Sequence, residues 1–264
     1  NHDAASNAGT LLGAMGRHEE ALACYERALA ARPDFPEATN NRGVSLAALE
    51  RNDEALACYA RAAELRPAYL DPRKNRAELL AKLGRNEEAL AAYDQAIEVA
   101  PDVAELISNR SIVLSVLNRH AQALQGYDRA LQLKPGFTDA LNNRGITLNA
   151  LNRFEEALQC FRDAIALAPE HVNAHWNESL TLLRLGRFTE GWQKHEWRWQ
   201  KPEFAPHKLD FKQPRWLGKE DVTGKTLLLT SEQGYGDSVQ FSRYVRLLEA
   251  RGARVLLFVP EPLV

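Results

Sequence analysis

Residues 138–171 read TDALNNRGITLNALNRFEEALQCFRDAIALAPEH, and residues 36–69 read PEATNNRGVSLAALERNDEALACYARAAELRPAY. Both stretches are 34 residues long, and the same kinds of residue stand at the same places in each. Steps of 34 residues outward from them divide the chain, without insertion, into units 2–35, 36–69, 70–103, 104–137, 138–171 and 172–205. The chain is therefore an array of six repeats.

Each unit reads as two helices joined by a turn. The eighth place holds Gly, Ala or Ser, the eleventh holds Leu, and the twenty-fourth holds an aromatic residue in the first five units. Small residues let two helices approach closely, and the Leu and aromatic side chains fill the space between them. A proline closes each of the first five units, and Gly16, Gly84 and Gly186, replaced by Asn or Glu elsewhere, mark the turn. The sequence thus predicts an all-α solenoid of six helix-turn-helix units, the last of them atypical.

The composition argues against several classes of protein. The 264 residues carry 33 Lys and Arg against 35 Asp and Glu, so a net charge of −2 provides no general attraction to nucleic acid. The lack of an apolar run of about 18 residues argues against membrane insertion. Three cysteines, Cys24, Cys58 and Cys160, cannot all pair, so free thiols in a reducing cytoplasm are expected. No His or Cys cluster has metal-ligand spacing, and because residue 1 is Asn we expect a piece of a longer protein.

The sixth place of every unit is Asn, on the side of the first helix opposite the packed stripe. These residues are Asn7, Asn41, Asn75, Asn109, Asn143 and Asn177. Because an amide is both donor and acceptor, such a row can pair with the backbone of an extended peptide whatever its side chains are. Recent duplication is the alternative explanation, but the fifth place has diverged between units while the sixth has not.

Two further places carry repeated charges that have more than one explanation. The second place holds an acid in the first five units, which complements the helix dipole or forms an acidic groove edge that favours basic ligands. The seventh place holds Arg42, Arg76, Arg110 and Arg144, whose stems we expect to pack between helices while the guanidinium pairs with a nearby acid. The structural explanation is favoured at both places.

The small, Leu, Ala, aromatic, Ala and Pro residues of this period resemble the tetratricopeptide repeat (TPR) family over residues 2–205. The resemblance implies a right-handed superhelix whose concave side is lined by the first helix of each unit. The repeated Asn is similar to the asparagine ladder in the superhelical TPR region of O-GlcNAc transferases. That likeness implies a protein or extended peptide bound along the concave groove.

The sixth unit departs from the pattern at residues 191–199, which read GWQKHEWRW. Trp192, Trp197 and Trp199 are predicted to form an interdomain seam that caps the solenoid. An aromatic ligand-binding cage is the alternative.

Residues 206–264 comprise a connector and a segment of different composition. Two apolar runs, 225–231 and 254–259, flank a stretch of helical periodicity at 238–251, which predicts a Rossmann-like β-α-β segment with two parallel, buried strands. Gly234 and Gly236 permit a tight turn after the first strand, and Asp237 or Ser238 is placed to cap the helix.

Residues 232–244, EQGYGDSVQFSRY, resemble the start of the GT-B, heptosyltransferase-like glycosyltransferase domain of bacterial TPR proteins. The resemblance implies that Asp237 faces the acceptor and acts as general base, whereas helix capping is the alternative role. In that architecture a second Rossmann half binds the nucleotide-sugar donor, so no cofactor is expected in this chain.

These resemblances predict a binding module that presents polypeptide acceptors to a transferase. One alternative is a transferase that acts on glycan or lipid, with the array used only for assembly. A scaffold that has lost catalysis is another.

Overall fold

The computed structural model describes residues 1–209, 211–230 and 235–259. Every repeat unit begins with two helices, as the period predicts. Their bounds are α1 His2–Ala14, α2 His18–Ala31, α3 Pro36–Ala48, α4 Asn52–Leu65, α5 Leu70–Lys82, α6 Asn86–Val99, α7 Ala104–Val116, α8 His120–Leu133, α9 Thr138–Ala150, α10 Phe154–Leu167, α11 Val172–Arg184 and α12 Phe188–His195. The chain divides into two compact parts, the helical array Asn1–Lys194 and the C-terminal part His195–Val264, whereas the sequence placed the end of the repeats at residue 205.

The turn between the two helices has the same backbone conformation in every unit. Gly16, Gly84 and Gly186 have φ of 74°, 72° and 75°, and Glu50, Asn118 and Asn152, at the same place, have φ of 60°, 59° and 58°. The left-handed conformation ends a helix most easily at Gly, which explains the glycines of the pattern. The second helices end two residues before the proline, because the residue that precedes proline avoids the helical region.

The core of each unit depends on the small residue at the eighth place. A Cβ on Gly43 would stand 2.7 Å from Cε1 of Tyr59, and a Cβ on Gly145 would stand 2.5 Å from Cε1 of Phe161. The ring of the second helix therefore packs directly on the backbone of the first. Both rings are buried, as is Leu46 at the eleventh place.

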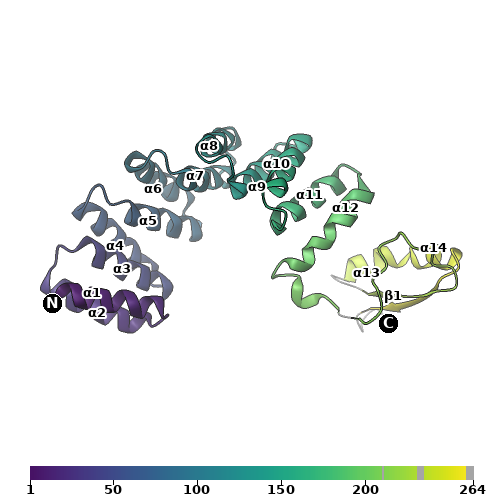
Figure 1. The fold of residues 1–264 in the computed structure, drawn as a ribbon, viewed down its shortest axis with the longest axis horizontal. Helices are drawn as coiled ribbons and strands as arrows, with labels where there is room; N and C mark the ends of the chain where they lie inside the picture. Colours follow the sequence, from purple (N-terminus) through teal and green to yellow (C-terminus); the bar gives the residue numbers. More distant parts are fainter. Residues whose placement is uncertain (210, 231–234, 260–264) are drawn as a thin grey trace. The chain divides into compact units, whose positions relative to one another are not determined.

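The units of the helical array follow one another along an arc (Figure 1). Each second helix packs on the first helix of the next unit, and first helices also contact one another directly, α1 with α3, α3 with α5, α7 with α9 and α9 with α11. In the view of Figure 1, α5, α7 and α9 lie on the inner side of the arc and α6, α8 and α10 on its outer side. The first helices therefore line the concave side, as the resemblance to the TPR family implied.

The C-terminal part begins with two short 3-10 helices, η1 Glu196–Gln200 and η2 Ala205–His207. Further on, strands β1 Thr226–Thr230 and β2 Arg254–Phe258 pair in parallel, with Leu228 opposite Leu256. The predicted single helix is instead two, α13 Tyr235–Ser242 and α14 Val245–Ala250. The parallel β-α-β order is therefore confirmed.

The prediction that both strands are buried is wrong for the described residues. Leu248 of α14 packs with Leu227, Leu229 and Val255 on one face of the sheet. The alternate side chains point to the other face, where Leu228 and Leu256 are each 47% exposed. The reason is that only one face of the two strands is covered.

Candidate functional site

The site begins with the exposed face of the first helices in the array. The second, sixth and ninth places are separated by four and three residues, so they lie along one face of a helix. Asn7 is exposed at the sixth place, and Asn41, Asn75, Asn109, Asn143 and Asn177 are half-buried. We call this surface, formed by the sixth and ninth places of the six units, the ladder face.

Hydrogen bonds link the ladder amides of the second and third units to each other and to Thr10 of the first unit. Nδ2 of Asn41 donates to Oγ1 of Thr10 in the first unit over 3.3 Å, and Oδ1 of Asn41 accepts from Nδ2 of Asn40 over 3.1 Å. Oδ1 of Asn40 in turn accepts from Nδ2 of Asn75, in the third unit, over 3.0 Å. The side chains of three successive first helices are thereby fixed relative to one another.

The same arrangement recurs in the last two units. Nδ2 of Asn142 donates to Oδ1 of Asn143 over 3.3 Å, and Oδ1 of Asn142 accepts from Nδ2 of Asn177 over 2.9 Å. Asn40 and Asn142 are 4% and 6% exposed, so their amides need these partners. Sequence reasoning treated the fifth place only as diverged and missed this role. The AsnAsn pairs at 40–41 and 142–143, each followed by Asn one unit later, were the available signal.

The fourth unit holds its amide differently. Its fifth place is Ser108, and its ladder residue, Asn109, interacts with the hydroxyl of Tyr93 on the preceding second helix. Burial, with a smaller effect from Glu78, raises the pKa of Tyr93, and the hydrogen bond to Asn109 opposes the shift. The hydroxyl therefore stays protonated at neutral pH and can orient the Asn109 side chain.

An apolar stripe runs beside the ladder amides at the ninth place. Val44, Ile112, Ile146 and Leu180 are 44%, 38%, 44% and 42% exposed. Exposed aliphatic residues at one place in four units form a repeated apolar surface next to the amides. The stripe is interrupted in the third unit by Glu78, whose carboxylate lies 3.9 Å from Nζ of Lys74. Sequence reasoning missed this stripe, although an aliphatic residue three places after Asn was its signal.

Two of the acids at the second place form ion pairs within the array. Glu37 pairs with Arg66 over 2.7 Å, and Glu105 pairs with Lys134 over 2.6 Å. The hydrogen bond from Lys134 holds the pKa of Glu105 below its usual value. These pairs favour the structural explanation of the acids over an acidic edge for basic ligands.

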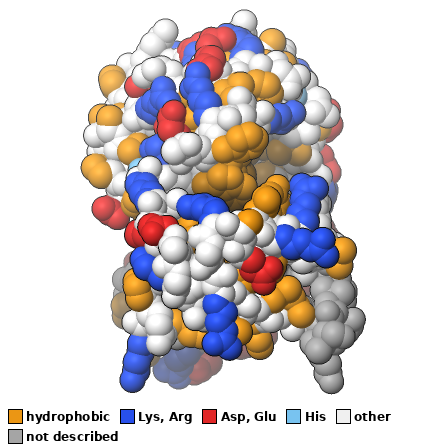
Figure 2. Space-filling view, turned by 90° about the vertical axis from the view of Figure 1, so that its right-hand side faces the viewer, with side chains coloured by type: hydrophobic (Ala, Val, Ile, Leu, Met, Phe, Trp, Pro, Cys, Tyr) orange, Lys and Arg blue, Asp and Glu red, His pale blue; other side chains and the backbone are white. Residues whose placement is uncertain are grey.

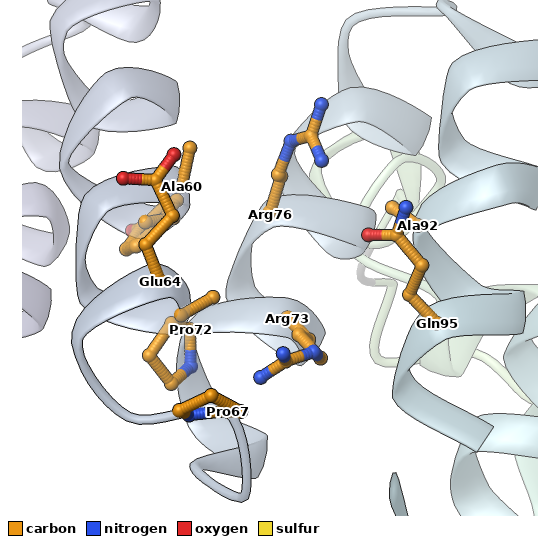
Figure 3. Close-up of a pocket in the computed structure, with 10 residues that line it drawn as sticks. Ala60, Glu64, Pro67, Pro72, Arg73, Arg76, Ala92 and Gln95 are labelled. Carbon is orange, nitrogen blue, oxygen red and sulfur yellow. The ribbon is translucent and has the colours of Figure 1, made fainter. Parts of the chain in front are cut away.

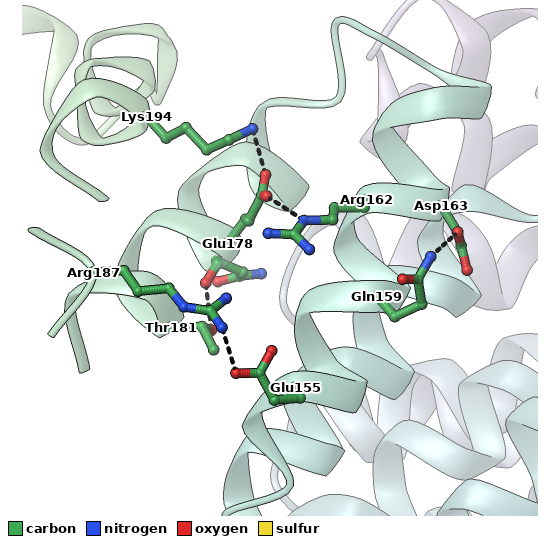
Figure 4. A network of polar contacts seen from close by, with 9 residues as sticks. Glu155, Gln159, Arg162, Asp163, Glu178, Thr181, Arg187 and Lys194 are labelled. Carbon is green, nitrogen blue, oxygen red and sulfur yellow. Dashed lines mark hydrogen bonds and ion pairs between the residues drawn. The ribbon is translucent and has the colours of Figure 1, made fainter. Parts of the chain in front are cut away.

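The charges at the seventh place form ion pairs between units, as expected for Arg110 and Arg144. Arg110 pairs with Asp94 of the preceding unit over 2.6 Å, and Arg144 pairs with Asp128 over 2.8 Å. In the last unit the signs of the two charges are exchanged. There Glu178, 1% exposed, pairs with Arg162 of the preceding unit over 3.2 Å and with Lys194 of α12 over 2.6 Å (Figure 4).

The predicted seam residues lie near the end of the repeats. Trp192 is on α12 and is 57% exposed, and Trp197 and Trp199 are in η1. The guanidinium carbons of Arg198 and Arg215 lie 4.3 and 4.8 Å from the Trp199 ring centroid. Trp199 therefore makes cation–π contacts with two arginines within the C-terminal part.

The predicted loop residues fall mostly outside the described structure. Gly234 lies outside the described residues, whereas Gly236 is in α13 with open space beside it. Asp237 also lies in α13, but its side chain is outside what the structure describes. Because α13 begins at Tyr235, Asp237 is in the first turn and is not the N-cap that the sequence suggested.

The described residues show few other features that would suggest a reaction or a cofactor. No group of three His, Cys, Asp or Glu side chains in them could hold a metal ion, and none of their helices has the length and apolarity to cross a bilayer. All three cysteines are free. In the face drawn in Figure 2, basic, acidic and apolar side chains are interspersed, without a surface of one charge sign.

Comparisons with known proteins agree with this arrangement. A family model described as Tetratricopeptide repeat matches residues 7–69 and 74–136, and another of the same description matches residues 138–171, together more than half of the chain. YrrB, described as a TPR protein with an unusual peptide-binding site, is 25% identical, with a TM-score of 0.56 over 64% of this chain and 88% of that chain. A thermophilic TPR protein from Thermus thermophilus, TTC0263, is 25% identical, with a TM-score of 0.53 over 69% of this chain and 100% of that chain.

A further solved structure supports the fold alone. PilW, a type IV pilus biogenesis factor, is 17% identical, with a TM-score of 0.67 over 77% of this chain and 94% of that chain. No curated protein matches the chain.

Proposed function

Because the chain belongs to the tetratricopeptide repeat family of protein-interaction modules, we propose that its array binds an extended polypeptide along the ladder face. The observation that carries the proposal is the exposed aliphatic stripe beside a complete row of Asn. The stripe offers apolar contact for alternate side chains of a ligand, and the amides offer hydrogen bonds to its backbone. The peptide-binding site for which YrrB is described adds support by similarity.

The hydrogen bonds between units prepare the amides for such a ligand. Asn75 uses one amide hydrogen toward Asn40, and within the described residues its other hydrogen and its oxygen are available to a ligand. Fixing the side chain in advance lowers the entropy lost when a ligand binds. The row therefore serves as a prearranged set of donors and acceptors.

The test replaces Asn75, Asn109 and Asn143 together with Ala. The probe is a peptide selected from a random-sequence library against the wild-type chain. Each lost hydrogen bond is worth about 0.5–1.5 kcal/mol, so affinity should fall by roughly tenfold to a thousandfold. The substitutions also remove partners of the buried Asn40, Asn142 and Tyr93. Ala is the better helix former at all three places, so the fold should stay intact with a loss of unfolding free energy of at most about 3 kcal/mol.

The control replaces Gln125 and Gln132, two exposed amides on α8, with Ala. This variant should bind the peptide as the wild type does. N-methylation of the peptide backbone should weaken binding to the wild type, because the amides are proposed to read the backbone. Unchanged affinity of the triple variant, or of the N-methylated peptide, would contradict the proposal.

We also propose that the C-terminal part belongs to a glycosyltransferase-like domain of the GT-B kind. The support is the parallel pairing of β1 with β2 around a helical crossover, together with the GYGD sequence at 234–237. The exposed Leu228 and Leu256 add to it, because parallel sheets are normally covered on both faces. The array would then present polypeptide acceptors, and Asp237 would act as general base on the acceptor hydroxyl. A glycan or lipid acceptor, with the array serving assembly, remains the alternative.

Calorimetry tests this second proposal in two steps. The 264-residue chain should not bind a nucleotide-sugar appreciably, because the resemblance assigns the donor to a second half of the domain. In a protein that also carries the second half of the domain, Asp237→Asn should abolish transfer and lower stability by less than about 1 kcal/mol, since an acid in the first turn of a helix contributes about 0.3–1 kcal/mol. Near-normal turnover of this variant would remove Asp237 from the proposed chemistry.

A further inference from the structure

A groove of about 370 Å³ lies between the second and third units, bounded by α4, α5 and α6. Figure 3 shows Arg73 and Arg76 of α5 projecting between Ala60 and Glu64 of α4 on one side and Gln95 of α6 on the other. Both arginine side chains are half-buried. We call this feature the Arg76 groove.

The groove occupies the position where later units place an ion pair. The twenty-fifth place of one unit and the seventh place of the next carry opposite charges at three successive junctions. These pairs are Asp94 with Arg110 at 2.6 Å, Asp128 with Arg144 at 2.8 Å, and Arg162 with Glu178 at 3.2 Å. At the junction of the second and third units the same places hold Ala60 and Arg76. The guanidinium is kept and the carboxylate is missing.

The charges around the groove leave it positive. Among the residues that the structure describes, no carboxylate forms an ion pair with Arg76. Arg73 donates through Nη1 to the carbonyl oxygen of Tyr69 over 3.0 Å, which leaves its charge unbalanced. Glu64 at the rim lies 3.5 Å from Arg61, which also pairs with Asp34 over 3.0 Å, so the lining carries two positive charges and one negative charge. Two guanidinium groups therefore face a space that an Asp side chain would otherwise fill.

We propose that the Arg76 groove binds the carboxylate of an acidic side chain from a polypeptide partner, in the position that Asp94 and Asp128 take at the next two junctions. Guanidinium forks match carboxylates in geometry and charge, and Arg110 and Arg144 show that this framework accepts the pair. The volume exceeds what one carboxylate needs, so the groove also admits the neighbouring part of a chain. The site uses a different face of α5 from Asn75 and does not depend on the ladder face.

The test uses polyglutamate and polyglutamine peptides of equal length, with acetate and inorganic phosphate as small-anion probes. Binding to the whole chain is followed by calorimetry and by the Arg76 Nε–H signal in NMR, with the already paired Arg110 as internal reference. Polyglutamate should bind and shift the Arg76 signal, and polyglutamine should not. Arg76→Met and Ala60→Asp should each weaken polyglutamate binding by roughly tenfold or more, a loss of about 1.4 kcal/mol.

Ala60→Asp keeps the test decisive if Arg76→Met folds poorly. It supplies the missing carboxylate from the chain itself, so it should compete with the ligand while leaving the fold intact. Wild-type affinity in the Ala60→Asp variant would overturn the proposal. Acetate or phosphate binding as tightly as polyglutamate would also overturn it, because the groove would then be a small-anion site. The triple Asn variant of the ladder face should bind polyglutamate normally, which separates the two proposals.

Discussion

The buried carboxylate of Glu178 allows a sharp test of how the last unit is held. Its side chain is 1% exposed and lies 3.2 Å from Nε of Arg162 and 2.6 Å from Nζ of Lys194. Replacing both cations with Met, in an Arg162→Met and Lys194→Met variant, leaves a charge buried without a counter-ion. Replacing Glu178 with Leu removes the charge and leaves an apolar side chain of similar volume.

The two variants should differ in stability. An unpaired buried charge costs about 3–5 kcal/mol, whereas Glu178→Leu leaves no buried charge and only the partly exposed Arg162 and Lys194 without their partner, so its loss should be smaller. Asp128→Asn, at the equivalent junction one unit earlier, is the exposed control. The Asp128 side chain is 53% exposed, so the loss there should be below about 1 kcal/mol.

The assay is native-state amide exchange in α11 together with urea denaturation, because repeat arrays unfold in local steps. A loss below about 1 kcal/mol at neutral pH would refute the burial argument.

Three further predictions follow from individual residues. Glu50→Gly should raise the unfolding free energy by about 1 kcal/mol because φ is 60° there, and Gly84→Ala should lower it by a similar amount because φ is 72°. Urea midpoints equal to that of the wild type in both variants would contradict this prediction. The hydrogen bond from Arg85 lowers the pKa of Glu88 from its usual 4.5, so the pair contributes to stability above that value, and this contribution is lost as the pH falls through the lowered pKa. Arg85→Gln should return the pKa of Glu88 to its usual value in a carboxyl NMR titration, and an unchanged pKa would exclude the pairing. Asn40→Ala should destabilise the chain by about 1–3 kcal/mol, since the amide is buried with two partners, and thermal melting like the wild type would show that they contribute nothing.

The packing within the units was predictable because the same types of residue make the same contacts in each unit. A small residue at the eighth place is required by the ring sixteen residues later, as the approach of Gly145 to Phe161 shows. The turn was predictable even where Gly is absent, since Asn118 and Asn152 take the left-handed conformation that Asn tolerates best. Glu50 adopts the same conformation although its side chain does not favour it.

Contacts between units were harder to infer. The role of Asn40 depends on Asn75 of the next first helix reaching back to it, which requires the two helices to lie side by side. The single predicted helix of the C-terminal part is interrupted at Arg243 and Tyr244, and the periodicity of residues 238–251 gave no sign of this. The exposure of Leu256 depends on what covers the sheet, which the sequence of the strand does not encode.

For the three paired charges at the seventh place, the number of partners increases with burial. Glu178, at 1% exposure, is paired with two cations; Arg144, at 24%, bonds to Asp128 and to Sγ of Cys160; Arg110, at 30%, has Asp94. A charge removed from water must recover its lost hydration from neighbouring groups, and the requirement grows with burial. Arg76 departs from this order, since it is half-buried and yet its acid has been replaced by Ala60. Four of the five junctions hold opposite charges at these two places, Glu26 and Arg42 at the first junction included, and the junction with Ala60 lacks the acid, so we expect a carboxylate from outside the chain to pair with Arg76.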